Sequence, residues 1–242
     1  MMESLSGKTV MVTGSAKRIG RGIALRLARE GARVLIHYNA SADEARAVAN
    51  ECGGGAEIFR ANLESVDEIR SMFREVRTRI GKLDGLVNNA ARFTRFDPLV
   101  LTEADWDFIH SVNLKATFFS CQQGALVMRE HGGGRIVNIS SLGGIRPWPE
   151  HVHYCASKAG VIHMTKALAV SLAPDISVNS VAPGVIPFGE AADERIQALV
   201  DKTPAGRAGT ADEIADAVVY FLTATKFVTG QVIAVDGGLS QR

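Results

Sequence analysis

The chain has 242 residues, of which 46% are hydrophobic and 22% are charged, enough apolar material for the core of one large domain. Its 27 Lys and Arg residues nearly balance its 26 Asp and Glu residues, so the basic excess typical of nucleic-acid binding is missing. No run approaches the ~20 apolar residues of a membrane-spanning helix, and we expect neither nucleic-acid nor membrane partners.

The cysteines and the first residues favour a cytoplasmic location. Cys52, Cys121 and Cys155 are odd in number, widely spaced and without a metal-ligand pattern, which is typical of a reducing compartment. Residues 1–7 lack a basic start followed by an apolar run, so we expect no secretory signal. The pattern predicts a soluble cytoplasmic protein without a metal site.

From residue 9 onward, short β-branched apolar runs alternate with longer amphipathic segments. The first pair predicts a strand over residues 9–13 and a helix over 19–30 that Gly31 closes. Further strands are predicted over 33–38, 56–60, 83–88, 135–140, 176–181 and 232–235, and further helices over 42–51, 66–80, 103–130, 151–173 and 212–222. This alternation predicts an α/β fold with a parallel sheet covered by helices on both faces. With no internal repeat or linker, we expect a single domain over residues 1–242.

Residues 13–22, Thr-Gly-Ser-Ala-Lys-Arg-Ile-Gly-Arg-Gly, join the first predicted strand to the first predicted helix. Small residues at such a turn let backbone N–H groups and the helix N-terminus approach a pyrophosphate. Glycines in a turn are weak evidence by themselves. Their position between a strand and a helix is what favours a dinucleotide site.

The segment after the second predicted strand indicates which dinucleotide is bound. An NAD enzyme places a carboxylate there to hold the adenosine ribose hydroxyls. This chain has instead His37, Tyr38, Asn39, Ala40 and Ser41. Lys17 and Arg18 stand in the preceding turn, and cations without a carboxylate favour a ribose 2′-phosphate. We therefore expect NADP(H), the alternative being that Lys17 and Arg18 only face solvent.

Tyr154 and Lys158 lie one turn apart on the predicted helix 151–173 and face the same side. An ammonium near a phenol stabilises the phenolate and lowers the phenol pKa from its usual ~10, which makes Tyr154 a usable general acid. Ser141 follows the predicted strand 135–140, and active groups of open α/β sheets lie at such strand ends. Its hydroxyl would hold the oxygen that Tyr154 protonates. Taken alone, the pair also fits an ordinary surface helix.

Together these motifs resemble the short-chain dehydrogenase/reductase family over essentially the whole chain. They are the glycine-rich turn, Asn88-Asn89-Ala90, Asn113, Ser141, Tyr154, Lys158 and Pro183-Gly184. The resemblance implies a Rossmann-type, doubly wound, seven-stranded parallel sheet, a small-molecule substrate and commonly a homotetramer. It implies a catalytic set of Asn113, Ser141, Tyr154 and Lys158, in which Lys158 holds the nicotinamide ribose and Asn113 positions a proton-relaying water.

The same resemblance assigns the cofactor contacts. They are Gly14, Arg18, Ile19 and Gly20 at the diphosphate, Asn62 and Leu63 near the adenine, Asn89 and Ala90 along the ribose, and Pro183, Gly184 and Val185 against the nicotinamide. Tyr154 and Lys158 complete the set. Two departures weaken parts of it, because Arg18 replaces the middle glycine of the turn and Asn62 replaces an acidic residue.

The substrate is the open point. Arg18 together with His37-Tyr38-Asn39 is similar to the pteridine reductase and dihydromonapterin reductase branch, and Phe93 is placed to stack on a flat pterin ring. Ser141 replaces the aspartate of the trypanosomatid enzymes, however, and residues 203–207 resemble β-ketoacyl-carrier-protein reductases. We expect NADPH-dependent hydride transfer to a carbonyl or a pterin C=N, with Tyr154 as general acid and a dihydropterin as the first candidate substrate. The alternatives are a β-ketoacyl-carrier-protein reductase-like carbonyl reductase and a non-catalytic NADP(H) sensor.

The remaining site predictions concern the walls of the substrate pocket. Phe93, Ser141, Trp148 and Phe188 are expected to line it, although Trp148 fits packing in a loop equally well. A loop over residues 187–198 is expected to form a lid. Arg92 and Arg95 are candidates for meeting an anionic substrate, with a solvated face as the commoner alternative.

Overall fold

One parallel sheet of seven strands runs through the whole chain, in the order β3-β2-β1-β4-β5-β6-β7. The computed structural model describes residues 2–187 and 194–242. The strands are β1 (Thr9–Val12), β2 (Arg33–Tyr38), β3 (Glu57–Arg60), β4 (Gly85–Asn88), β5 (Gly134–Ile139), β6 (Ile176–Pro183) and β7 (Val232–Val235). The predicted Rossmann-type fold, with this strand number and parallel pairing, is confirmed.

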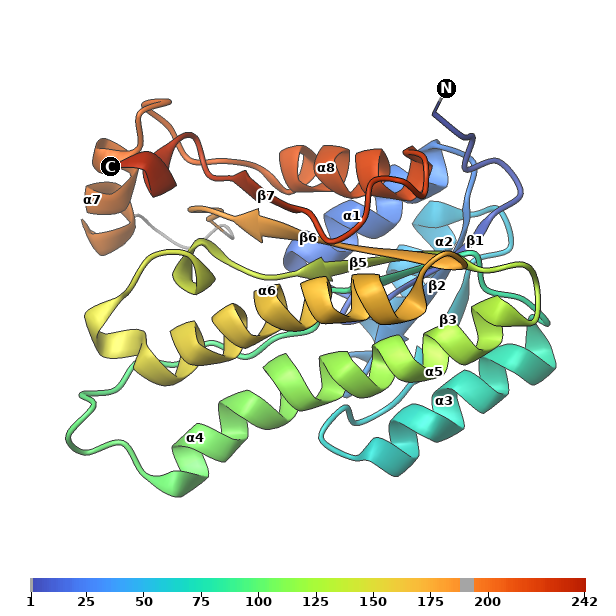
Figure 1. Ribbon diagram of the computed structural model, residues 1–242, viewed down its shortest axis with the longest axis horizontal. Coiled ribbons are helices and arrows are strands. Elements are labelled where there is room, and N and C mark those ends of the chain that lie inside the picture. The colour runs from blue at the N-terminus through green and yellow to red at the C-terminus, as the bar shows by residue number, and fades with distance from the viewer. Residues whose placement is uncertain (1, 188–193) are drawn as a thin grey trace.

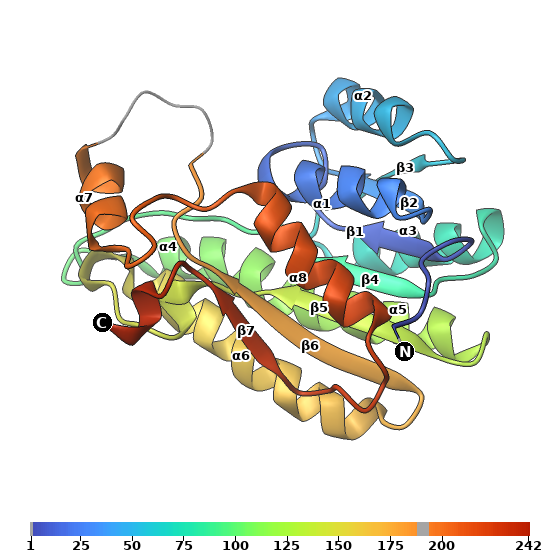
Figure 2. The same ribbon diagram turned by 90° about the horizontal axis from the view of Figure 1, so that it is seen from above.

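Helices cover both faces of the sheet. They are α1 (Arg18–Arg29), α2 (Ala42–Cys52), α3 (Val66–Arg79), α4 (Glu103–His110), α5 (Thr117–Arg129), α6 (Val152–Leu172), α7 (Glu194–Lys202) and α8 (Ala211–Thr223). Figure 1 shows α1 and α8 on one side of the sheet and α3, α5 and α6 on the other, and Figure 2 shows the strands fanning out beneath α8. In the described ranges, none of the helices has the length and apolar character needed to cross a membrane.

The covering of both faces of the sheet explains the apolar residues of β1. In β1, Val10 and Val12 pack into the core cluster that α1, α2 and α8 share, whereas Met11 packs into the opposite cluster with α3 and α5. All three side chains are at most 1% exposed. A strand buried on both faces favours apolar residues at successive positions, which explains why residues 10–12 of β1 form a continuous apolar run rather than an alternating one.

The predicted helix over 103–130 is interrupted. A π-helical turn, η1 (Ser111–Ala116), separates α4 from α5 and contains Asn113. Such a turn widens the helix by one residue and is frequent at functional sites. Periodicity did not reveal it, because a single π turn hardly changes the pattern of apolar residues.

The predicted loop over 187–198 is wrong in its described part, because α7 begins at Glu194. Ile196, Leu199 and Val200 recur at helical spacing there, and the nearby prolines obscured this short pattern. Phe188, the predicted lid and substrate residue, lies outside the described residues. The other predicted elements match the structure to within one or two residues at their ends.

The strand order reverses direction at β1 and β4, where the chain passes from β3 at one edge back to the middle of the sheet. Ligands of open α/β sheets bind at this kind of reversal, beyond the carboxyl ends of the strands. The glycine turn follows β1, Asn89 follows β4, and Ser141 follows β5 shortly after its end. The topology therefore gathers the predicted site residues at one end of the sheet.

Candidate active site

Close backbone approaches make two glycines of the turn after β1 necessary. Gly14 has a φ of +62°, and a Cβ there would lie 2.9 Å from the Cα of Ala90. A Cβ on Gly20 would lie 2.3 Å from the carbonyl oxygen of Gly14. Arg18 adopts the left-handed φ of +56°, a conformation that non-glycine residues rarely take.

The beginning of α1 suits an anionic group. In the described part of the chain, the Lys17 side chain at the N-cap makes no capping hydrogen bond, and the first turn contains no acidic residue. The first backbone N–H groups of a helix have no partner inside the helix, and the helix dipole adds positive potential there. These residues fit a pyrophosphate, and the contacts predicted for Gly14, Ile19 and Gly20 stay predictions.

Asn89 ties the end of β4 to the glycine turn. Its Nδ2 donates to the carbonyl oxygens of Thr13 (3.0 Å) and Gly14 (3.1 Å). In return the Thr13 hydroxyl oxygen accepts hydrogen bonds from the backbone N–H groups of Asn89 (2.9 Å) and Ala90 (3.1 Å). Sequence reasoning overlooked Thr13, although a threonine directly before the first glycine of such a turn is a usable signal.

The residues after β2 occupy different depths. His37 is only 2% exposed, because its ring lies beneath the glycine turn and accepts a hydrogen bond from the Gly14 N–H. A direct contact between this ring and a cofactor is therefore excluded by burial. Tyr38 is partly buried, Asn39 is exposed, and Ser41 is the N-cap of α2.

Lys17 forms a 2.7 Å ion pair with Glu44 of α2, and both side chains are about half exposed. The carboxylate lies next to the place predicted for a 2′-phosphate. A salt bridge this exposed is worth little, so it is a weak competitor for a doubly charged phosphate. Lys17 thus faces solvent, as the alternative has it, and pairs there with Glu44.

The predicted adenine contacts form a turn before α3. Asn62 Oδ1 accepts a hydrogen bond from the Glu64 N–H (3.1 Å), and the Asn62 N–H donates to Glu68 Oε2 (2.8 Å). Leu63 is 6% exposed and packs in the core cluster around α3 and α5. The side chain of Asn62 is thus engaged in shaping the turn.

The structure brings Ser141 and Tyr154 together. The Ser141 hydroxyl hydrogen-bonds the Tyr154 phenol and also accepts from the Gly143 N–H (3.0 Å), which fixes its direction. Tyr154 is 9% exposed. Burial raises the pKa of this phenol to about 12, against the lowering effect of the Ser141 hydrogen bond.

The prediction that Lys158 lowers the pKa of Tyr154 is therefore wrong for this structure. Lys158 Nζ lies 5.9 Å from the centre of the Tyr154 ring and donates to the Ile139 carbonyl oxygen (2.9 Å). Burial lowers the pKa of Lys158 itself to about 8. The spacing placed the two groups on one face correctly, but desolvation dominates both titrations because each group is taken out of water.

The Asn113 side chain holds the segment around Arg92 in place. Its Oδ1 accepts from the Arg92 N–H (2.7 Å), and its Nδ2 donates to the Arg92 carbonyl oxygen (2.9 Å) and to Ser157 Oγ (3.2 Å). Ser157 in turn donates to the carbonyl oxygen of Tyr154 (2.7 Å). Both N–H groups of the side-chain amide are thus used, whereas Oδ1 can accept one more hydrogen bond, and the water-positioning role stays a prediction. The amide links the loop after β4 to α6.

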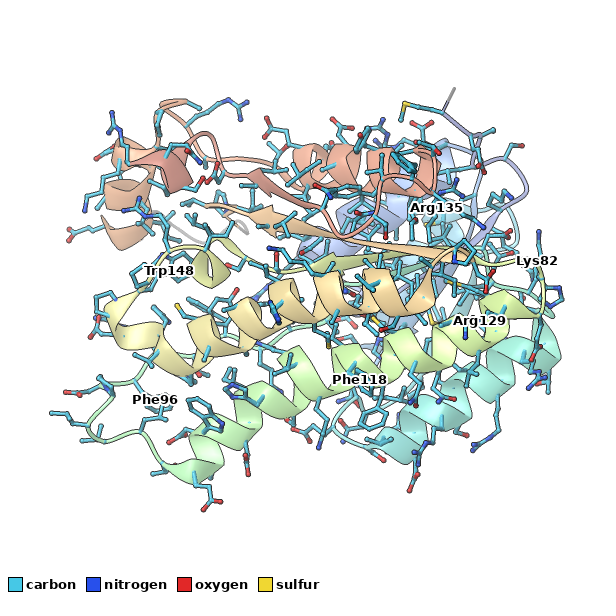
Figure 3. The ribbon with its side chains drawn as sticks, viewed as in Figure 1. Lys82, Phe96, Phe118, Arg129, Arg135 and Trp148 are labelled. Atoms are coloured by element: carbon cyan, nitrogen blue, oxygen red, sulfur yellow. The ribbon has the colours of Figure 1, made fainter. Side chains whose placement is uncertain are left out.

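Two rings contact the Tyr154 ring, and a third extends the cluster. Phe93 meets it edge-on with ring centres 4.8 Å apart, and Trp148 lies parallel to it at 6.1 Å. His151 stacks on Phe93 at 4.5 Å. Phe93 is still 58% exposed, so the cluster presents an aromatic surface beside the catalytic side chains. Figure 3 shows Trp148 and Phe96 toward one end of the molecule and Lys82, Arg129 and Arg135 toward the other.

The two arginines considered for an anionic substrate are engaged elsewhere. Arg92 pairs with Glu64 and lies 3.9 Å above the Phe108 ring, and Arg95 pairs with Glu150. His153 is buried, and its Nε2 contacts the Thr94 hydroxyl (2.7 Å). In the described ranges, no group of three or more His, Cys, Asp or Glu residues is arranged to hold a metal ion.

The residues after β6 form the wall predicted to face a nicotinamide. Gly184 donates its N–H to the Val235 carbonyl oxygen (3.0 Å), and a Cβ on it would lie 2.6 Å from the Cα of Asp236. Pro183 ends β6 and Val185 follows, half-buried. Only glycine fits this approach of β6 to the segment after β7.

Known proteins resemble this chain over its whole length. A family described as Enoyl-(Acyl carrier protein) reductase matches residues 14–240. The 3-oxoacyl-acyl-carrier-protein reductase of Staphylococcus aureus is 39% identical over 241 residues, covering 96% of this chain and 98% of that protein. A gluconate 5-dehydrogenase from Burkholderia cenocepacia, solved with NADP and tartrate, is 31% identical with a TM-score of 0.92, over 98% of this chain and 97% of that one. An angucycline C-6 ketoreductase with bound NADP is 34% identical with a TM-score of 0.92, over 99% and 98%.

Proposed function

Because this chain belongs to the short-chain dehydrogenase/reductase family of NAD(P)-dependent oxidoreductases, we propose that it is an NADPH-dependent reductase of 3-oxoacyl thioesters. The observation that carries the substrate class is the 39% identity, along nearly the whole of both chains, to a 3-oxoacyl-acyl-carrier-protein reductase. The resemblance of residues 203–207 to such enzymes supports the same class. This proposal replaces the expected dihydropterin, which no relative named above supports.

The cofactor supplies the hydride, and the chain aligns the groups that handle the proton. Tyr154, whose pKa of about 12 keeps it protonated at neutral pH, gives its proton to the carbonyl oxygen as that oxygen gains negative charge. The Ser141 hydroxyl donates to the same oxygen and holds it in place. Lys158, whose Nζ lies 5.9 Å from the centre of the Tyr154 ring, would hold the nicotinamide ribose beside these groups.

Three features support NADPH over NADH. Residues 37–41 contain no carboxylate, Lys17 and Arg18 flank the start of α1, and two of the similar solved proteins are described with NADP. A bound 2′-phosphate forms charge-assisted hydrogen bonds with a guanidinium, which are stronger than neutral ones. We propose that Arg18 is the principal cation for this phosphate.

Replacing Arg18 with alanine is expected to raise the dissociation constant for NADPH by about 10-fold to 100-fold, the effect of losing a hydrogen bond to a charged group. The dissociation constant for NADH should change by less than about threefold, because NADH lacks the 2′-phosphate. Fluorescence titration of both cofactors measures this. Arg21→Ala is the matched control, since Arg21 lies one turn further along α1 and pairs with Glu51. Equal losses for the two cofactors would contradict the assignment.

The substrate proposal is tested by following NADPH consumption with a 3-oxoacyl thioester, a dihydropterin and a sugar ketone. We expect the highest kcat/KM with acetoacetyl thioesters. A higher value with the dihydropterin would restore the pterin reading, which the exposed ring of Phe93 favours. NADPH binding without turnover of any of these compounds would favour a non-catalytic sensor, although Ser141, Tyr154 and Lys158 are all present.

The homotetramer and the cytoplasmic location stay predictions. Four large apolar side chains are exposed on α4 and α5, which supports association between copies of the chain through these helices. They are Trp106, Phe108, Phe118 and Leu126. Exposed apolar groups that gather on one surface are typical of protein interfaces.

A further inference from the structure

His37 is bonded to the glycine turn through its backbone as well as its ring. It lies near the carboxyl end of β2, opposite Phe59 of β3. Its N–H donates to Ser15 Oγ (3.2 Å), and its carbonyl oxygen accepts from the Ser15 N–H (3.1 Å). The turn after β1 is thus fastened to this one position of β2.

The ring makes two further bonds that fix its proton. The Gly14 N–H donates to Nδ1 (2.9 Å), so Nδ1 is unprotonated. Nε2 lies 3.1 Å from the Ala61 carbonyl oxygen, which only accepts, so Nε2 carries the proton. Burial lowers the pKa of His37 to about 4, and the ring therefore stays neutral around pH 7. One neutral imidazole joins the glycine turn to the segment that follows β3.

We propose that His37 is a positioning residue for the cofactor, whose ring holds Gly14, and with it the glycine turn, in the conformation that admits a pyrophosphate. It does so without touching the cofactor. The inference rests on the proposed use of NADPH and adds how the turn is kept ready for it. Few side chains could replace histidine at position 37, because the side chain must accept a hydrogen bond from the Gly14 N–H and donate one to the Ala61 carbonyl oxygen at the same time. A carboxylate only accepts, and an ammonium only donates.

Removing the His37 ring should lower the affinity for NADPH, because fewer molecules then have the glycine turn in the conformation that binds the cofactor. A partly buried Gly14 N–H left without its acceptor drives the turn toward other conformations. The cofactor binds only the conformation of the turn that admits a pyrophosphate. Its apparent affinity is therefore reduced in proportion to the fraction of molecules that have this conformation. Once NADPH saturates the enzyme, the turn is restored, and kcat is little changed.

The test compares His37→Leu, which removes both ring bonds, with His37→Gln, whose amide again supplies one acceptor and one donor. Fluorescence titration gives the dissociation constant for NADPH, and thermal unfolding gives stability. For His37→Leu we expect the dissociation constant to rise by about tenfold or more, with kcat at saturating NADPH within about threefold of wild type. His37→Gln should recover most of the affinity. Ile36→Val is the matched control, because it removes one buried methyl group from β2 and leaves the hydrogen bonds of His37 to the turn in place.

A merely structural role predicts a different result. If His37→Leu and Ile36→Val lower the unfolding temperature alike while both bind NADPH as wild type does, the proposal is overturned. Should His37→Leu fail to fold, nitrogen NMR of the wild-type ring decides, because a protonated Nδ1 is incompatible with the bond from Gly14. The titration needs no substrate, so it does not depend on the 3-oxoacyl assignment. Wild-type protein that binds no NADPH would instead remove the proposed function itself.

Discussion

Replacing Tyr154 with phenylalanine is expected to lower kcat by about 10²-fold to 10⁴-fold, the contribution of a positioned general acid. The ring and its contacts with Phe93 and Trp148 remain in the variant, so only the proton that reaches the substrate oxygen is lost. The dissociation constant for NADPH should stay within about twofold of wild type. Initial rates of NADPH consumption and a fluorescence titration measure the two quantities.

Tyr220→Phe is the matched control for this variant. Tyr220 lies on α8 and is 40% exposed, so loss of its hydroxyl should leave kcat unchanged. Turnover that survives in Tyr154→Phe would remove Tyr154 from the proton transfer. A parallel loss in both variants would mean that the assay reports damage to the fold and not loss of an acid.

Replacing Lys158 with methionine is expected to abolish most turnover and at the same time to stabilise the protein. Lys158 is 3% exposed, and its pKa of about 8 compared with 10.5 in the unfolded chain means that the buried ammonium destabilises the fold at neutral pH. The shift corresponds to about 3 kcal/mol. The Ile139 carbonyl oxygen loses its donor in the variant, which offsets part of this gain. A net increase of about 1–3 kcal/mol in the free energy of unfolding at pH 7 follows.

The stability difference between Lys158→Met and the wild type is expected to depend on pH. Between pH 8 and pH 10.5 the unfolded chain binds a proton at Lys158 that the folded chain has lost, so the wild type gains stability as the pH rises through this window. The advantage of Lys158→Met is therefore largest below pH 8 and shrinks toward pH 10.5. Urea unfolding at pH 7 and pH 10 measures it. Lys166→Met, on an exposed part of the same helix, is the control.

A variant that is less stable than wild type at pH 7 would contradict the cost assigned to the buried ammonium. A gain in stability that does not change with pH would contradict titration of Lys158 as its cause. A stabilised protein without activity is the combination expected when a catalytic group is kept in an unfavourable environment.

The aromatic cluster limits the kinds of substrate group that can reach the Tyr154 phenol. Phe93, Trp148 and His151 present rings, whereas Arg92 and Arg95 are held by Glu64 and Glu150. The described wall around the phenol thus suits uncharged groups better than a carboxylate. This agrees with a thioester carbonyl as the reacting group in the proposed function.

The site was predictable where it depends on spacing along the chain. Tyr154 and Lys158 share a helix face because they stand one turn apart, and Ser141 lies at a strand end because the apolar run before it stops there. The Ser141 and Tyr154 side chains do meet. The role of Asn113 was not predictable, since its partners at Arg92 and Ser157 are distant in sequence.

The sequence by itself determined the alternation of strands and helices, the parallel sheet and the places of the glycine turn, because these follow from local periodicity and from residues that turns require. Only the tertiary structure decided that burial sets the pKa values of Tyr154 and Lys158, that His37 lies beneath the turn, and that residues 194–202 form a helix. Desolvation and hydrogen-bond partners depend on which segments meet in space. Nothing in the sequence indicates that residues 37 and 61 are in contact, because only the pairing of strands in the sheet brings them together.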